Sequence, residues 1–141
     1  MGFSLVAAFA VIGVSILIAI EIFIGSLLPA ITDIDDSYND MVDRTVDRVQ
    51  TDINITGVSV SVNGSNYDHN ITLENTGSVT LNTDDFTILI NGTFQQFSCL
   101  DTYLYPEKET YFNISNLPGS GIKRLKVITD NSISDYYEYN I

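Results

Sequence analysis

The stretch FSLVAAFAVIGVSILIAIEIFIGSLL, from Phe3 to Leu28, decides how this chain is organised. It contains 26 residues, and Glu21 is its one ionisable side chain. As an α-helix with a rise of about 1.5 Å per residue it would reach about 39 Å, enough to cross a hydrocarbon core of about 30 Å. A secretory signal has a basic segment first and an apolar core of about 7 to 15 residues, which does not fit here. We therefore expect residues 1–28 to form a transmembrane anchor that is retained.

Two features of this anchor are candidates for contact with another membrane helix. Mostly small side chains, among them Ser15 and Ala19, recur at helical spacing along one stripe, and such stripes let helices approach closely. A carboxylate such as Glu21 is costly inside a bilayer, so it is expected to contact a partner helix or to reach the outer headgroups. Ordinary lipid-facing sequence is the alternative explanation for the stripe.

An acidic amphipathic pattern follows the anchor over residues 29–52. Apolar side chains keep helical spacing from Ile31 to Val49, while aspartates recur every three or four residues on the opposite side. This pattern predicts a stalk helix that continues outward, with a kink at Pro29. Its narrow apolar stripe needs cover from the following domain or from a second copy, so a homodimer is one expectation.

From Ile53 onward the hydrophobic period changes from helical to two. Seven or eight short strands are expected in residues 53–141, with a bulge at Gly57 and a two-residue hairpin turn at Asn91-Gly92. Short strands at this spacing are typical of an immunoglobulin-like antiparallel β-sandwich. The predicted fold class is therefore an N-terminal transmembrane helix and amphipathic stalk, followed by an all-β domain.

Composition excludes several classes of function. The chain has 18 Asp and Glu against 6 Lys and Arg, so its exposed part would repel nucleic acid. One thiol, Cys99, which we expect to be buried, and one histidine, His69, which we place in a turn, make neither a metal site nor a catalytic pair. We predict no cofactor and no enzymatic activity.

The end of the β-domain holds the candidate partner-binding residues. A basic cluster in an acidic domain offers a landing site to an acidic partner, and tyrosines are enriched at interfaces. In the alternative interpretation, Tyr137, Tyr139 and Ile141 face the core while Tyr136 and Glu138 face water. The candidates are Lys123, Arg124, Lys126, Tyr136, Tyr137 and Tyr139.

Five Asn-x-Ser/Thr sequons predict that the β-domain lies outside the cell. About two would be expected by chance from this composition, and such sequons mark exposed loops in secreted proteins. The candidate glycosylation sites are Asn54, Asn63, Asn70, Asn91 and Asn113. We therefore expect a single-pass membrane protein whose membrane lipid contacts are made by the N-terminal helix.

Four segments of the chain resemble a known family. The opening MGFS, the segment LENTGSVTLNTDDFTILINGT at 73–93, LYPEKET at 104–110 and RLKVITDNSISDYYEY at 124–139 are similar to the F accessory protein of the archaeal flagellum, the archaellum. This resemblance implies a β-sandwich between the cell membrane and the S-layer. It further implies binding to S-layer protein, self-association, and work with the related G-type accessory protein as the static part of a rotary motor.

Two other interpretations remain open. An archaellin or type IV pilin-like filament subunit also combines an apolar N-terminal helix with a β-rich head, although its precursor carries a short basic leader that is not seen here. A generic cell-surface adhesion or binding ectodomain would suit the same anchor and sandwich.

Overall fold

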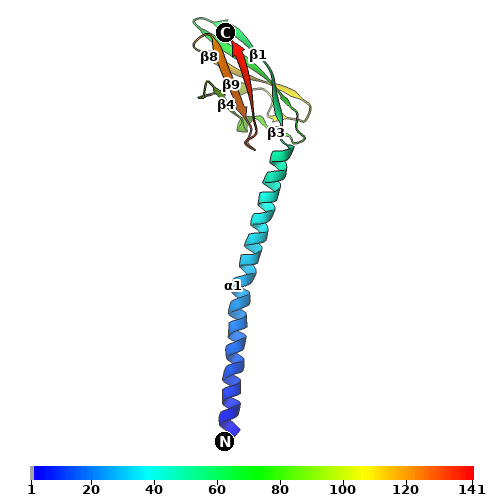
Figure 1. The fold of residues 1–141 in the computed structure, drawn as a ribbon, viewed down its shortest axis with the longest axis vertical. Coiled ribbons are helices and arrows are strands. Elements are labelled where there is room, and N and C mark those ends of the chain that lie inside the picture. The colour runs from blue at the N-terminus through cyan, green and yellow to red at the C-terminus, as the bar shows by residue number, and fades with distance from the viewer. Residues whose placement is uncertain (1) are drawn as a thin grey trace. The chain divides into compact units, whose positions relative to one another are not determined.

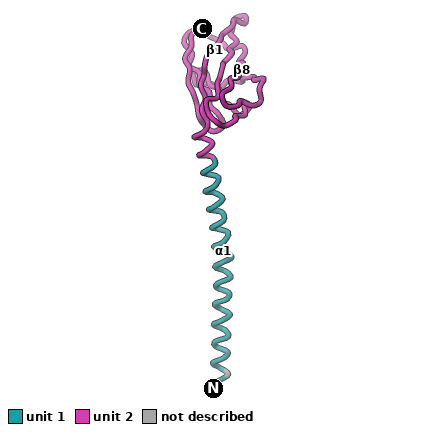
Figure 2. The backbone as a smooth tube through the Cα atoms, turned by 90° about the vertical axis from the view of Figure 1, so that its right-hand side faces the viewer, with its two compact units in different colours: residues 1–43 teal, residues 44–141 magenta. Residues whose placement is uncertain are grey.

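A computed structural model describes residues 2–141, so Met1, with which the expected anchor begins, lies outside the described residues. The chain divides into two compact units, residues 1–43 and residues 44–141 (Figure 2). The first unit is helical. The second contains the end of the helix and every described strand.

The apolar run and the acidic stretch after it form one α-helix, α1 (Gly2–Gln50). Pro29 lies inside this helix, and its ring nitrogen has no hydrogen to donate to the carbonyl of Gly25. Leu27, Leu28 and Ala30 beside it are good helix formers, and the helix continues on both sides of the proline. The expected anchor and stalk are therefore parts of one continuous helix.

The side chains of α1 have two different characters along its length. All those that the structure describes are exposed, including the apolar ones between Leu5 and Leu28. By length and composition, α1 can cross a membrane. In the acidic part the apolar side chains also remain exposed, as Tyr38 at 60% and Val49 at 80% illustrate. The helix thus presents an uncovered apolar surface to lipid or to other helices.

Residues 53–141 form antiparallel sheets (Figure 1). One four-stranded sheet has the order β1-β2-β8-β6, the other has the order β10-β9-β4-β5, and β3 pairs with β7 in a short ladder. This arrangement confirms the predicted fold class of a helix followed by an all-β sandwich. The strands are β1 (Ile53–Asn63), β2 (Asn66–Asn75), β3 (Leu81–Asn82), β4 (Thr87–Ile90), β5 (Thr93–Gln95), β6 (Ser98–Cys99), β7 (Tyr103–Leu104), β8 (Glu109–Leu117), β9 (Ile122–Ile128) and β10 (Ser134–Asn140).

One apolar core joins the two four-stranded sheets. Alternate residues of β2 and β8 point into it, which is the pattern of a sheet with one buried face. Phe112 is fully buried and meets the rings of Phe86 and Phe97 edge to face, with centroids 5.3 Å and 5.1 Å away. The buried apolar residues are Ile53, Ile55, Ile71, Leu73, Leu81, Phe86, Ile88, Ile90, Leu104, Phe112, Ile114, Leu117, Leu125 and Val127.

The local turn signals of the sequence are confirmed. The register between β1 and β2 shifts between Ile55 and Gly57, where the bulge was predicted. Asn91 and Gly92 both have positive φ, at 50° and 79°, as a two-residue turn between β4 and β5 requires.

The number of strands differs from the prediction: residues 2–141 contain ten. The two-residue strands β3 and β6 were not expected. A two-residue strand shows no period in the sequence, and its pairing depends on a distant segment: β3 pairs with β7, and β6 with β8. The loop between β3 and β4 contains a 3-10 turn at Thr83–Asp85, capped by the side chain of Asn82.

The last turn of α1 is fastened to the loop after β2 within the second unit. The backbone N–H of Gly77 donates to the carbonyl of Asp52 at 3.0 Å, and that of Ser78 donates to Gln50 at 2.9 Å. These bonds satisfy the carbonyl groups of Gln50 and Asp52. The last carbonyl groups of a helix have no N–H donor within the helix itself, so they need partners from elsewhere.

Candidate interaction surfaces

The outward side of the β10-β9-β4-β5 sheet is the first candidate surface, which we call the β9 face. Tyr136 pairs with Lys126, and Lys126 pairs with Leu89. Leu89 pairs in turn with Phe94. Cross-strand pairs share one side of a sheet, so these side chains form a row across all four strands. The β9 face consists of Leu89, Phe94, Ile122, Arg124, Lys126, Tyr136 and Glu138.

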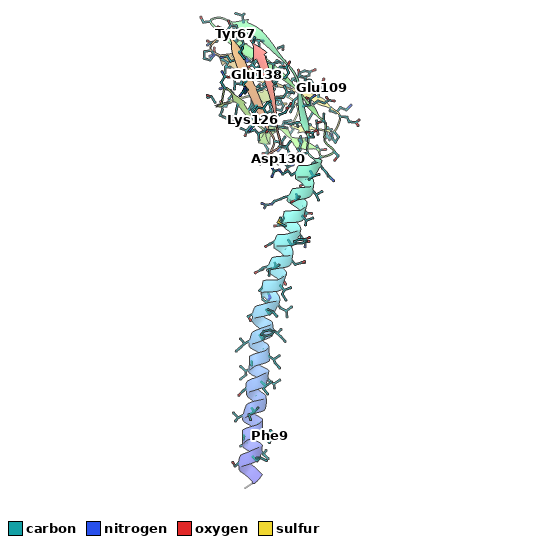
Figure 3. The ribbon with its side chains drawn as sticks, viewed as in Figure 1. Phe9, Tyr67, Glu109, Lys126, Asp130 and Glu138 are labelled. Carbon is teal, nitrogen blue, oxygen red and sulfur yellow. The ribbon has the colours of Figure 1, made fainter. Side chains whose placement is uncertain are left out.

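The β9 face combines exposed apolar groups with organised charges. Ile122 is 75% exposed, and Tyr136 is 57% exposed. The Nζ of Lys126 lies 5.0 Å from the ring centroid of Tyr136, and Arg124 Nη2 lies 2.7 Å from Glu138 Oε1. Figure 3 labels Lys126 and Glu138 on β9 and β10. These side chains, with the β4–β5 turn, line a hollow of about 520 Å³.

The β4–β5 turn closes one end of this hollow. The backbone N–H of Asn91 donates to the carbonyl of Arg124 at 2.8 Å. In return, the backbone N–H of Arg124 donates to Asn91 Oδ1 at 2.9 Å. The position of Asn91 at the rim is therefore set by two bonds to β9.

The structure separates the candidate partner-binding residues into two groups. Arg124, Lys126 and Tyr136 lie together on the β9 face. The other three, Lys123, Tyr137 and Tyr139, occupy the alternate positions of the same strands and are half-buried. Tyr137 and Tyr139 pack against the core, which is where the alternative interpretation placed them. Lys123 Nζ donates to the carbonyl of Pro118 at 3.3 Å.

His69 does not lie in a turn as predicted, and this correction changes its environment. It lies within β2 and is 1% exposed. Its Nδ1 is 2.9 Å from the hydroxyl of Tyr139, and the two rings meet edge to face. This contact links one four-stranded sheet to the other. Apolar and polar residues alternate around His69, and this pattern favours a strand over a turn.

Burial shifts the titration of both members of this contact. Burial lowers the pKa of His69, the charge of Lys123 lowers it further, and Asp68 opposes both effects. Burial raises the pKa of Tyr139 to about 12. His69 Nε2 is buried without a hydrogen-bond partner among the described residues. The neutral histidine is therefore the form that suits the fold.

The outward side of the β1-β2-β8-β6 sheet is polar and contrasts with the β9 face. A hollow of about 490 Å³ there is lined largely by hydroxyl, amide and carboxylate groups from β1, β2 and β8. The pKa of Asp68 is lowered because it accepts hydrogen bonds from the backbone of Asn116 and the side chain of Asn63. A polar outward side needs no partner to cover it.

The five sequon asparagines occupy different settings. Asn91 lies in the exposed turn at the rim of the β9 face. Asn70 and Asn113 pair with each other in the middle of β2 and β8, and both are half-buried. Asn54 is exposed on β1, and Asn63 is exposed at the end of β1 with its amide bonded to Asp68.

The candidate membrane contacts lie in the apolar part of α1. Ser15, Ala19 and Glu21 are all exposed. Ser15 Oγ donates to the carbonyl of Val11 at 2.8 Å, so its hydroxyl is satisfied inside the helix. Within residues 2–141, the carboxylate of Glu21 makes no hydrogen bond of this kind.

Cys99 packs against the core as expected, but it is half-buried and not buried. It lies on β6, an edge strand of its sheet, which leaves one side of the residue open. Its Sγ is 3.3 Å from Thr110 Oγ1. Within residues 2–141, no group of three or more His, Cys, Asp or Glu side chains lies together as a metal site.

Sequence reasoning missed the apolar members of the β9 face. Leu89, Phe94 and Ile122 were not singled out, although β4 and β9 carry apolar residues at both odd and even positions. A strand with one buried side should alternate, and the departure from alternation was the available signal.

The chain is similar to a known protein family along nearly its whole length. A model described as archaeal-type flagellin matches residues 2–138, which include both α1 and the β-sandwich. No curated protein matches the chain.

Proposed function

Because this chain belongs to the archaeal-type flagellin family, we propose that it is a non-enzymatic archaellum component of the filament-subunit type. In this proposal α1 assembles with the helices of other subunits and the β-sandwich remains outside. The observation that carries it is the family match, which covers the helix and the sandwich together. This function fits the family match better than the static motor part that the sequence resemblance implied.

The uncovered apolar surface of α1 supports assembly through the helix. Burying one Leu, Ile or Phe side chain away from water contributes about 1.5–3 kcal/mol, so a helix exposed along residues 5–28 is stabilised by association wherever it would otherwise meet water. A bundle of such helices would bury these side chains against one another without lipid.

A second candidate function is the membrane-anchored accessory protein of the F type. The distribution of charge favours it, because α1 has no basic residue before Arg44. A bundle of identical helices would bring copies of Glu21, and copies of the aspartates from Asp33 to Asp40, close together without cations beside them. A separate anchor avoids this repulsion. Its proposed partners are S-layer protein and the G-type accessory protein, with the sandwich outside the membrane.

Fractionation of the native cells separates the two candidates. Sheared filaments and washed membranes would be purified, and this chain would be quantified in each by peptide mass spectrometry against a known filament subunit. A filament subunit is expected mainly in the filament fraction, at a fixed ratio to filament mass. Recovery in the membrane fraction alone would contradict it and favour the accessory protein.

A capture experiment then tests the accessory candidate directly. The full chain in detergent would be incubated with cell-envelope extract, and the retained proteins identified. Retention of S-layer protein supports the accessory function, and its absence contradicts it. Deletion of the chain without any loss of motility would contradict both candidates and leave the adhesion ectodomain.

A further inference from the structure

The sheet with the order β1-β2-β8-β6 has two outer strands, β1 and β6. Among the described strands, each of them pairs on one side only. The other side of an outer strand presents backbone N–H and C=O groups that can pair with another chain. Proteins usually protect such an edge with charged side chains, with proline or with a covering segment.

Neither edge of this sheet carries a charged side chain or a proline. The chain has 18 Asp and Glu and 6 Lys and Arg, but none of them lies in the segment from Ile53 to Tyr67, which contains β1. None lies from Phe86 to Leu100 either, and this segment contains β6. Two copies that meet through these edges therefore bring no charges of the edge strands together, although the formal net charge of the chain is −12.

β1 is closed at its beginning and open further along. Asp135 Oδ2, from β10, accepts the backbone N–H of Ile55 at 2.8 Å. Beyond the bulge at Gly57, no hydrogen bond among the described residues joins β1 to β10. Val62, near the end of β1, is 77% exposed. The open edge of β1 is therefore its second half, from Val58 to Val62.

The opposite edge of the sheet is also exposed. β6 is the short strand Ser98–Cys99, and it pairs with β8. Leu100, which follows β6 directly, is 96% exposed. Covering such a side chain removes apolar area from water, which favours association.

The directions of the strands allow the two edges to fit each other. β1 is antiparallel to β2, β2 to β8, and β8 to β6, so β1 and β6 run in opposite directions. When two copies lie side by side in the same orientation, β6 of one copy is antiparallel to β1 of the next. The contact would then continue the sheet with the antiparallel pairing that it already has.

We infer that a second copy of this chain pairs its β6 edge with the Val58–Val62 edge of β1, so that the sheet continues from one copy to the next. The two contacting edges are different, so each copy keeps one edge free for a further copy. Such head-to-tail contacts produce rings or helical arrays. The pairing suits a filament, but it does not depend on how α1 assembles. Its failure would leave the proposed function standing, because that proposal rests on the family match.

A row of paired side chains crosses the whole sheet and indicates what Cys99 would face in a neighbouring copy. Ile71 pairs with Val58 on one side and with Phe112 on the other. Phe112 pairs in turn with Cys99. Paired residues share one side of a sheet and Phe112 is fully buried, so Cys99 lies on the inner side. In a continued sheet, Cys99 therefore faces β1 residues of the next copy that also lie on the inner side.

Cysteine substitutions on β1 test the pairing, with the native Cys99 as the second thiol. Val58 and Val60 lie on the inner side of the sheet, whereas Ser59 between them lies on the outer side. Val58→Cys or Val60→Cys should form a disulfide with Cys99 of a neighbouring copy, and which of the two reacts faster depends on the register. Ser59→Cys is the matched control and should not form this disulfide.

The full-chain variants would be produced in the native host, and washed envelopes and sheared filaments would be oxidised with copper phenanthroline. Because each copy offers both thiols, the expected product on a non-reducing gel is a ladder of dimers, trimers and larger species. Adding Cys99→Ser should abolish the ladder. The inference is overturned by no ladder from either inner-side variant, by an equal ladder from Ser59→Cys, or by dimers alone, which indicate a two-fold contact.

A charge placed on the open edge provides a second test. Val62→Lys, combined with Val60→Cys, adds the kind of side chain that protects natural edges, and most of the ladder should be lost. Ile122→Lys in the same background is the control, because Ile122 is 75% exposed on β9 in the other sheet and the change in charge is the same. Equal ladders from the two lysine variants would overturn the inference.

Discussion

His69 is the residue whose titration is expected to affect stability. It is the one histidine of the chain and is almost fully buried against Tyr139. Its folded-state pKa is lowered, chiefly by burial, and then by Lys123, so protonation costs free energy in the folded protein. The unfolded chain binds the proton with a pKa near 6.5, and stability therefore falls as the pH drops through that value.

We predict that the free energy of unfolding decreases between about pH 7.5 and pH 5.5, a window in which ordinary carboxylates stay ionised. The measurement is urea denaturation of the full chain in detergent, followed by tyrosine fluorescence. His69→Gln should reduce the pH dependence in this window, whatever its stability at pH 7.5. An unchanged slope would show that another group titrates there.

At the scale of elements, the loop after β2 determines how the end of α1 joins the sandwich. Gly77 lies so close to the chain after the helix that a Cβ there would clash with the carbonyl oxygen of Gln50 and the amide nitrogen of Asp52. Both clashing atoms belong to backbone that is itself hydrogen-bonded, so neither can move freely.

We predict that Gly77→Ala lowers the free energy of unfolding by about 1–3 kcal/mol, the usual cost of forcing extra atoms into a packed site. The control is Gly57→Ala, because a Cβ at Gly57 would meet no atom within 4 Å. That variant should remain within about 0.5 kcal/mol of the wild type in denaturant titrations. Equal stability of the two variants would contradict the close approach at Gly77.

At the scale of the whole molecule, charge is expected to govern self-association. The formal net charge is −12, and aspartates line one side of α1 beyond Pro29. Copies of the chain therefore repel one another while their apolar surfaces attract. Salt screens the repulsion, since the Debye length falls from about 10 Å at 0.1 M to about 3 Å at 1 M.

We predict that the full chain in detergent associates more strongly as salt is raised, as measured by sedimentation velocity. The triple variant Asp36→Asn, Asp40→Asn, Asp43→Asn should show a weaker dependence on salt. A control with the same net charge, Glu74→Gln, Asp84→Asn, Glu107→Gln, should behave like the wild type. Dissociation at high salt would instead indicate attractive charge contacts between copies.

The membership of the chain in a filament-protein family also bears on this scale. The sequence resemblance pointed to the archaellum, and the family match supports that coarser assignment. The family match fits a filament subunit at least as well as it fits a static part of the motor. A helix followed by a β-rich head suits both, because each needs an apolar helix and an exposed domain.

By itself the sequence determined the features that depend on neighbouring residues. The 26-residue apolar run from Phe3 to Leu28 specifies a helix that can cross a membrane. The bulge at Gly57 and the turn at Asn91-Gly92 follow from local conformational preference, and the structure confirms both. Local signals suffice for such features because each involves only a few consecutive backbone angles.

Only the tertiary structure decided which segments meet. The order of the strands, the contact of His69 with Tyr139 across 70 residues, and the close approach of Gly77 to the end of α1 leave no local signal. The same holds for the β9 face, whose row of side chains comes from four strands. Burial and pairing depend on long-range packing of the whole sandwich, and the spacing of neighbouring residues does not encode which distant strand provides the partner.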